Sequence, residues 1–364
     1  MSMIFQKSKL LIPASLMFFI LLLLSGCSAE VRSGFQATPV AYGKINQIAV
    51  VSDDDTWNSA IGDTILYYYS SAYPILPQPE PLFDLIHFTP FDLESSAVRR
   101  EMRIYLVVAD LSDTDSPATQ MVLNDIGSEK AYQAKSDPDQ SSVVIRDKWA
   151  SGQMVIYQFA YSKADLIDQI IKRFPAAAKR INEFDRDKIR ATVYQSGENT
   201  EESAEILAKM GAKVQVPGDY ITAISNDDVI WLRKETDFLS SNLVFHKFKY
   251  TDQSQLTREG IKAVRDSIGK KYISSTLPGT YMQVNDKDLP MFTSVKTLHN
   301  RYALEARGIW EVVGDFMGGA FISYLIHDPD KPDLLFVDGF VHAPGKDKRD
   351  YMQNLEYIIS TIEY

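Results

Sequence analysis

Apolar and polar side chains alternate along the C-terminal third of the chain. Over residues 309–316, apolar residues and a glycine occupy every second position on one face, and this period of two indicates a half-buried strand rather than a helix. Residues 317–319 include two glycines and can turn the chain, and 320–326 returns as a second apolar strand. A third apolar run follows at 334–341. The pattern predicts an antiparallel meander, with an amphipathic helix within 347–364 lying across it.

Short strands and amphipathic helices alternate through the rest of the chain. Ser162 and Asp165 have the spacing of a capping box at the start of a long helix, which Pro175 is expected to kink or divide. The charged, aperiodic segment 127–141 predicts a surface loop. Further strands are expected at 46–51, 82–89, 104–109, 143–149, 153–159, 220–225, 229–232, 243–250 and 280–284. These elements predict an α+β fold in which antiparallel or mixed sheets are covered by helices.

The two halves of the chain repeat an order of elements. In each half a strand, a helix and a second strand precede a hairpin that carries a tryptophan, Trp149 in the first and Trp310 in the second. This order predicts a duplicated α+β unit, with one half at 46–200 and the other at 201–364. Chance is the alternative, because a hairpin followed by a helix is a common arrangement.

Residues 1–27 have the order of a bacterial lipoprotein signal peptide. Two lysines precede an apolar run at 10–24, and the run leads into the sequence LSGC at 24–27, which resembles a lipobox. The resemblance implies cleavage before Cys27 and attachment of acyl chains, palmitate among them, to that cysteine. A transmembrane helix is the alternative, and the apolar run is short for one.

Cys27 is the only cysteine of the chain. Once it carries lipid, the mature protein has no disulfide, no thiol nucleophile and no thiolate metal site. Several acyl chains on one cysteine exceed what stable anchoring requires. Residues 28–45 are small and polar and predict a tether between lipid and fold. Because Ser28 rather than aspartate follows the cysteine, we expect an outer-membrane lipoprotein that faces the periplasm.

The balance of acidic and basic residues indicates which classes of binding partner are unfavourable. Without the leader the chain has 36 basic and 48 acidic residues, a net charge of −12. Such a balance argues against nucleic acid and anionic lipid as partners, since both are bound by clustered lysine and arginine.

One motif suggests hydrolytic chemistry. The strand at 46–51 is followed by Asp53, Asp55 and a helix, an arrangement similar to the haloacid-dehalogenase-like phosphatases. That family needs Asp-x-Asp-x-Thr, and here Thr56 comes one residue early. The other interpretation is that these carboxylates cap the N-terminus of the following helix and oppose its dipole.

A charged row on the strand of the second half is a candidate binding surface. Arg307, Glu311 and Asp315 share one strand face and could border a groove, or form the solvent face of an antiparallel strand. Trp149 and Trp310 lie beside turn glycines and could line a ligand surface, although hairpin aromatics more often belong to a core.

Catalytic and cofactor signatures are missing from the sequence. It contains no nucleophile elbow, P-loop, dinucleotide fingerprint or zinc-protease motif, and its five histidines are dispersed. We therefore expect neither a metal nor a cofactor.

The chain resembles an uncharacterised lipoprotein family of Bacteroidetes-type bacteria. The resemblance rests on the lipobox, the hairpin WASGQ at 149–153, which contains Gln153, and the stretches RGIW at 307–310 and DFMGG at 315–319. Members of this family have no known activity, so the resemblance implies location and architecture but no catalytic residue.

These observations favour a lipid-anchored binding or assembly module that meets an envelope protein or glycan. The alternative is an envelope hydrolase acting on phosphate esters or glycans. The carboxylates available to such a hydrolase are Asp53, Asp55, Glu311 and Asp315.

Overall fold

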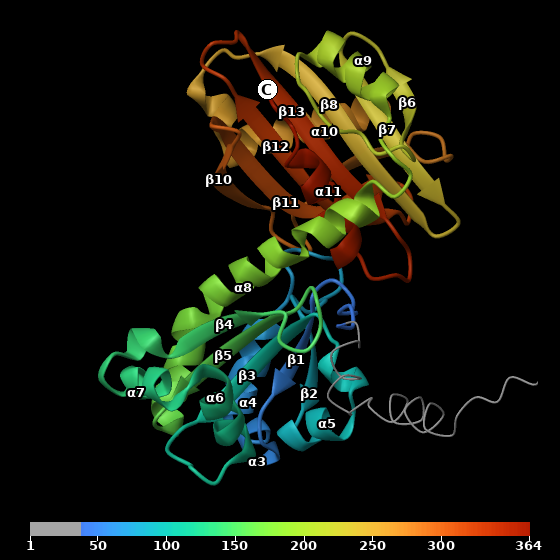
Figure 1. Cartoon of the computed structure of the whole chain (residues 1–364). Coiled ribbons are helices and arrows are strands. Elements are labelled where there is room, and N and C mark those ends of the chain that lie inside the picture. The colour runs from blue at the N-terminus through green and yellow to red at the C-terminus, as the bar shows by residue number, and fades with distance from the viewer. Residues whose placement is uncertain (1–37) are drawn as a thin grey trace, which may run out of the picture.

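Two different sheets organise the chain, one in each half (Figure 1). The computed structural model describes residues 38–364, so the predicted leader and the lipobox lie outside the described residues. Within the described part, no helix combines the length and apolarity needed to cross a bilayer. The expected α+β class, with one mixed and one antiparallel sheet covered by helices, is confirmed.

The first sheet is mostly parallel. Its strand order is β2-β1-β3-β5-β4, in which only β4 is antiparallel to its neighbour. Every residue of β3 and of β5 is buried, as expected for central strands covered on both faces. The strands are β1 (Gln47–Val51), β2 (Asp84–Phe88), β3 (Ile104–Asp110), β4 (Ser142–Arg146) and β5 (Met154–Ala160).

Helices cover both faces of this sheet. One core packs α4 (Ala60–Tyr69) and α8 (Lys163–Val193) on alternate side chains of the strands. The other core packs α5 (Pro90–Ser95), α6 (Pro117–Ile126) and α7 (Ser128–Ser136) on the opposite face. The first half is therefore a three-layer α/β/α domain.

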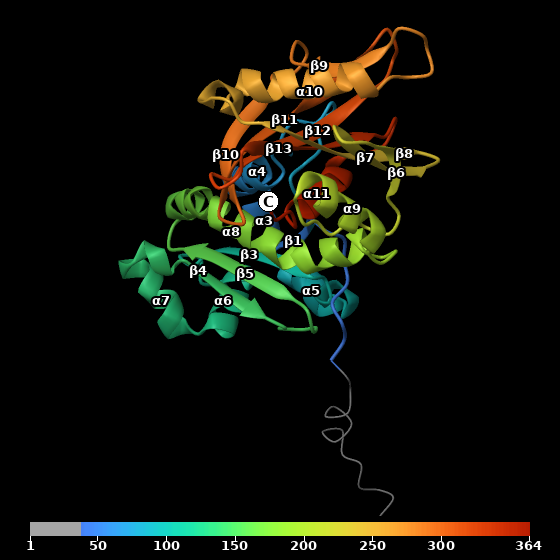
Figure 2. The same cartoon turned by 90° about the horizontal axis from the view of Figure 1, so that it is seen from above.

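The second sheet is antiparallel, with the order β10-β11-β12-β13-β8-β7-β6 and with β9 also paired to β11. The helices α9 (Thr200–Met210) and α11 (Arg349–Ile359) cover one face, and α10 (Arg258–Tyr272) covers the other (Figure 2). The predicted meander, closed by a helix that lies across the sheet, is confirmed. The strands are β6 (Ile221–Ser225), β7 (Val229–Thr236), β8 (Leu239–Lys249), β9 (Tyr281–Asn285), β10 (Phe292–Leu298), β11 (Arg301–Val313), β12 (Gly318–His327) and β13 (Asp333–His342).

The turn within the meander lies earlier than predicted. Gly318 and Gly319 already belong to β12, and the residue with positive φ is Gly314, at +85°. Gly319 is needed for packing instead, because a Cβ there would lie 1.9 Å from the main-chain oxygen of Val341.

Two predictions about local structure were wrong. Segment 127–141 is not an irregular loop, since it forms α7 and a short 3-10 turn, and Ala131 and Ala134 of α7 are buried. Pro175 does not divide α8, which runs unbroken for 31 residues, whereas a kink at Pro175 stays a prediction. In α7, the packing of the two buried alanines outweighs the local signal.

The predicted duplication is also wrong. The first sheet is parallel apart from β4, whereas the second is antiparallel throughout, and their strand orders cannot be superposed. The similarity along the sequence is the recurrence of a common hairpin arrangement in two unrelated topologies.

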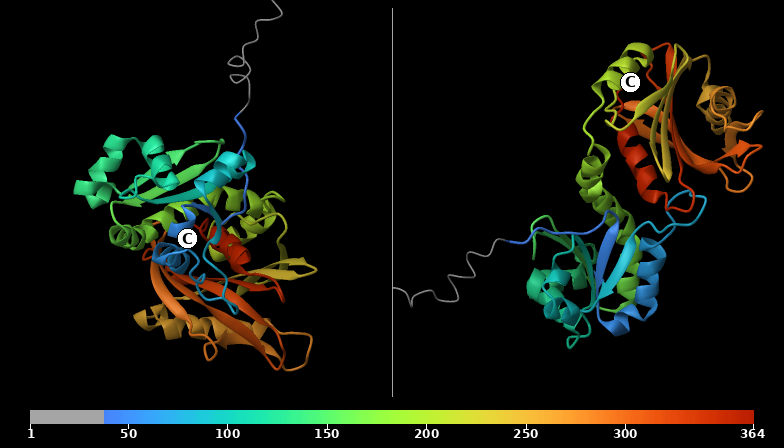
Figure 3. Two further views of the ribbon diagram at one scale, coloured as in Figure 1. Left: turned by 90° about the horizontal axis from the view of Figure 1, so that it is seen from below. Right: turned by 90° about the vertical axis from the view of Figure 1, so that its right-hand side faces the viewer.

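The two domains meet around the first turn of α11. Glu80 belongs to a loop that reaches from the first domain to the second (Figure 3), and its buried carboxylate accepts the backbone N–H groups of Lys348 (2.6 Å) and Arg349 (2.8 Å). The Arg349 guanidinium returns to the first domain, where it pairs with Asp84 at 2.8 Å. A residue of one domain therefore caps a helix of the other.

We predict that Glu80→Ala lowers the free energy of unfolding by about 1–3 kcal/mol, because two N–H groups at a buried helix end lose their acceptor. Urea denaturation followed by circular dichroism measures the change. Glu129→Ala, at an exposed position on α7, serves as the control. Equal unfolding midpoints for the two variants would contradict the capping role.

Candidate functional site

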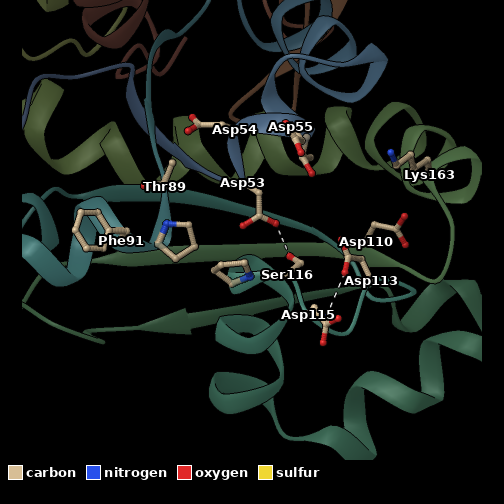
Figure 4. A pocket seen from close by; sticks show the side chains of 13 residues that line it. Asp53, Asp54, Asp55, Thr89, Phe91, Asp110, Asp113, Asp115, Ser116 and Lys163 are labelled. Atoms are coloured by element: carbon tan, nitrogen blue, oxygen red, sulfur yellow. Dashed lines mark hydrogen bonds between the residues drawn. The ribbon is translucent and has the colours of Figure 1, made fainter.

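An open cleft of about 620 Å³ lies at the carboxyl ends of the parallel strands. Strands β2 and β3 flank β1 on opposite sides, so the cleft sits where the connections of a doubly wound sheet diverge and where such folds bind ligands. Its lining includes six aspartates and one lysine, which Figure 4 shows around the opening. These charged residues are Asp53, Asp54, Asp55, Asp110, Asp113, Asp115 and Lys163.

Asp53 connects the end of β1 to the start of α6. Its carboxylate accepts a hydrogen bond from the Ser116 hydroxyl (Figure 4). It accepts another from the Ala118 backbone N–H at 3.1 Å. It makes no side-chain hydrogen bond to its own helix α3 (Asp54–Trp57), which it precedes as the N-cap residue. Asp53 was predicted to cap the helix that directly follows it. It instead accepts hydrogen bonds at the start of α6, a helix that begins 64 residues further along the chain.

This contact places a carboxylate of the chain at the N-terminus of α6. The N-terminus of a helix that follows a β-strand is the usual anion site of α/β folds, because its free N–H groups and its dipole favour negative charge. Here the Asp53 carboxylate already occupies that position on α6. A phosphate group of a ligand would have to compete with a carboxylate that the chain itself supplies.

The other carboxylates of the cleft differ in how firmly they are held. Asp110 is buried at the end of β3 and accepts the Ser112 N–H (3.0 Å) and hydroxyl (2.7 Å). Asp54 and Asp55 are exposed, and within residues 38–364 their carboxylates have no hydrogen-bond or ion-pair partner. Nor do any three His, Cys, Asp or Glu side chains of that range converge closely enough to hold a metal ion.

A second cleft of about 550 Å³ continues from the first between α5 and α6. The two share Pro90, Phe91 and Pro117, and the Phe91 side chain is 74% exposed at their junction. Trp149 lies at the far end, packed edge-on against Tyr105 with ring centroids 5.1 Å apart. Together the two clefts form one groove, acidic at one end and aromatic at the other.

Gln153, which the sequence marked as a candidate binding residue, has no free polar atom. Its side-chain oxygen accepts the N–H groups of Trp149 (2.9 Å) and Ala150 (3.0 Å). Its amide nitrogen donates to the main-chain oxygens of Arg100 (2.5 Å) and Met102 (2.8 Å). Gln153 is fully buried, so it holds the loop that presents Trp149.

Arg307 lies in another cleft, of about 400 Å³, between the two domains. It pairs with Glu305 (3.0 Å) and Glu356 (2.5 Å) and lies 3.5 Å from the Tyr73 hydroxyl of the first domain. Burial raises the pKa of Tyr73, and the Glu356 carboxylate raises it further. Burial is the largest single influence and would lower the pKa of Arg307, but Glu356, Glu305 and Tyr73 together raise it above its ordinary value. Arg307 is thus a charged member of the domain interface.

The predicted charged row does not form one surface. Glu311 accepts from Gln283 (2.8 Å) and Asn285 (3.0 Å), whereas Asp315 lies in the β11–β12 turn and accepts the N–H of the next residue. Trp310 is buried and donates its indole N–H to a main-chain oxygen of β13, at 3.2 Å. The four carboxylates proposed for a hydrolase do not lie together either. Asp53 and Asp55 belong to the first domain, whereas Glu311 and Asp315 belong to the second.

Several residues of the groove were not identified from the sequence, among them Asp110, Asp113, Phe91 and Lys163. One signal was present. The predicted strands at 46–51 and 104–109 are each followed closely by aspartate, and the carboxyl ends of parallel strands meet at one edge of a sheet.

Comparison with known proteins divides the chain into two parts. Residues 41–195 match the family model described as domain of unknown function DUF8532, and residues 199–361 match domain of unknown function DUF4837. The expected resemblance to an uncharacterised family is confirmed. A search of curated proteins finds no match.

The similarities to solved structures are weak. A Bacteroides thetaiotaomicron protein is 12% identical over 42% of this chain and 44% of its own, with a TM-score of 0.23. The Saccharomyces cerevisiae Ran-binding protein Mog1p is 10% identical over 42% of this chain and 89% of its own, with a TM-score of 0.27. The human StarD13 lipid transfer and protein localization domain is 12% identical over 39% and 84%, with a TM-score of 0.20. Scores this low carry no inference about fold or function.

We predict that Asp53→Ala lowers the free energy of unfolding by about 1–2 kcal/mol, because the Ala118 N–H and the hydroxyl of Ser116, the N-cap residue of α6, lose their acceptor. Asp55→Ala, which removes an exposed carboxylate two residues away, should change stability by less than about 0.5 kcal/mol. Both are measured by urea denaturation. An Asp53 variant as stable as the Asp55 variant would show that the carboxylate does not cap α6.

Proposed function

Because the chain consists of two domains of unknown function, its role must be inferred from geometry, and we propose that it is a lipid-anchored envelope protein that binds a cationic segment of a partner protein. The observation that carries this proposal is the cleft in which six aspartates gather while Asp53 fills the anion position of α6.

The charge of the cleft favours cations over phosphate esters. Two unit charges 4 Å apart interact by about 1 kcal/mol in water and about 4 kcal/mol at the effective dielectric constant of a protein surface. Of the described residues that line the cleft, Lys163 is the single basic one. A dianionic phosphate would therefore be repelled by these side chains, and this disfavours a phosphate-ester hydrolase that acts without a divalent cation. The same repulsion disfavours nucleic acid and anionic glycans.

The length of the groove favours a peptide over a small cation. The acidic end can take a lysine or arginine, and the exposed ring of Phe91 can stack on the cation. In the cleft beyond it, Leu93, Met121 and Trp149 can pack on an apolar side chain. The same cleft is also lined by Glu94 and Arg100 and by the ion pair of Asp125 with Lys148. An extended segment with a basic residue next to an apolar one would use both ends.

Lipid attachment at Cys27 would hold this groove at a membrane. The support is the order of charged, apolar and LSGC segments at the start of the sequence. We place the protein at the outer membrane, facing the periplasm, where its partner would be another envelope protein.

The anchor makes a direct prediction. Cys27→Ala should move the protein from the membrane to the soluble fraction, because the acyl chains lose their attachment atom, whereas Ser25→Ala should leave it in the membrane. Fractionation of the cell envelope followed by immunoblotting measures this. Unchanged membrane retention of the Cys27 variant would remove the lipoprotein assignment.

The groove makes a second prediction. In a fragment that begins at Ser28, Asp54→Asn with Asp55→Asn should weaken binding of an octalysine peptide about 5- to 30-fold, taking about 0.5–1 kcal/mol for each exposed carboxylate. Isothermal titration calorimetry at an ionic strength of about 0.1 M, where the Debye length is about 10 Å, gives the dissociation constants.

The matched control removes two exposed carboxylates elsewhere, with Glu129→Gln and Asp227→Asn. It makes the same change in net charge and should leave the affinity within about twofold, since charges beyond a Debye length are screened. Equal losses in both double variants would mean that octalysine responds only to net charge, and the cleft would not be the site.

A further inference from the structure

The first described residues run along the edge of the N-terminal domain rather than away from it. We call residues 38–43 the strap. Pro39 accepts the Ser151 N–H at 2.8 Å, and Ala41 donates its own N–H to the Ser151 main-chain oxygen, also at 2.8 Å. Tyr42 donates to the Glu101 oxygen (2.8 Å). The predicted tether therefore ends earlier than residue 45, because these backbone bonds fix the strap on the domain.

The strap carries apolar side chains into solvent. Val40 is 77% exposed and Tyr42 is 48% exposed, and their spacing of two places them on one side of an extended segment. The Tyr42 hydroxyl donates to the main-chain oxygen of Val98 (3.2 Å), whose side chain is itself 58% exposed. We call Val40, Tyr42 and Val98 the strap patch.

The patch lies at the opposite end of the sheet from the acidic cleft. Tyr42 forms a bridge with Met102 and Val40 with Ser151, and these partners immediately precede β3 and β5. The patch is thus at the amino ends of the parallel strands, whereas the cleft is at their carboxyl ends. What covers the patch determines which way the cleft faces.

The path of the chain indicates what covers the strap patch. Val40 lies 13 positions after Cys27, and a fully extended chain over that many positions spans at most about 45 Å. The lipid that we place on Cys27 therefore lies within reach of the patch. Charge disfavours the opposite orientation, because the six aspartates at the other end of the sheet would be repelled by anionic headgroups.

We propose that the strap patch rests on the lipid surface to which Cys27 anchors the protein, so that the acidic cleft opens away from the membrane. This inference rests on the anchoring proposed above. Exposed aliphatic and tyrosine side chains next to arginine are the composition of a membrane-interface contact.

Fluorophores at single introduced cysteines test the orientation. The only native cysteine is Cys27, so in the lipidated protein the introduced residue is the one free thiol. An environment-sensitive NBD label is placed by Val98→Cys or Tyr42→Cys. Control labels are placed by Phe91→Cys at the cleft and by Leu207→Cys on α9, both exposed positions. The full-length lipidated protein is reconstituted into phosphatidylcholine–phosphatidylethanolamine vesicles.

Labels at Val98 and Tyr42 should be blue-shifted and quenched by spin-labelled lipid at least threefold more than labels at Phe91 and Leu207. Using two labels in the patch guards against a local effect of one substitution. Protein that floats with the vesicles but shows equal quenching at all four positions would overturn the orientation and leave the anchor intact. Protein that does not float with the vesicles would overturn the anchor and the orientation together.

Discussion

The character of the N-terminal domain depends on one contact, the Asp53 carboxylate at the N-terminus of α6. In a doubly wound sheet this position is where a ligand's anion would sit. By filling it from its own chain, the protein stabilises the start of α6 and leaves a cleft whose remaining charges are mostly negative. The cation preference that we propose for the cleft follows from the position of that side chain.

The second domain supports the first rather than sharing its site. Glu80 caps α11 across the interface, and Arg349 pairs back to Asp84. Arg307, Glu305 and Glu356 form a partly buried ionic network beside Tyr73 at the same interface. Both contacts cross between domains through charged groups that need their partners once they are withdrawn from water. The groove and the strap patch both lie on the first domain, which is held on the second by these contacts.

The sequence predicted what local patterns determine. The meander could be predicted because side chains alternate in the second half of β11, because apolar runs follow at β12 and β13, and because the turns between these strands are short. Asp53 and Asp55 could be identified because they follow a clear strand. The partner of Asp53 could not, since Ser116 lies 63 positions away and is brought close only by the pairing of β1 with β3. Phe91 carries no sequence signal either, because its exposure depends on how α5 meets α6.

The most direct test of the account is a photo-crosslinker at Phe91 in the intact envelope, followed by sequencing of the captured peptide, with the same crosslinker at Tyr132 for comparison. Both side chains are exposed, at 74% and 64%, but only Phe91 lines the groove. The account predicts that Phe91 captures a peptide with lysine or arginine beside an apolar residue and that Tyr132 does not. Capture of an acidic peptide, or of the same peptide from both positions, would contradict it.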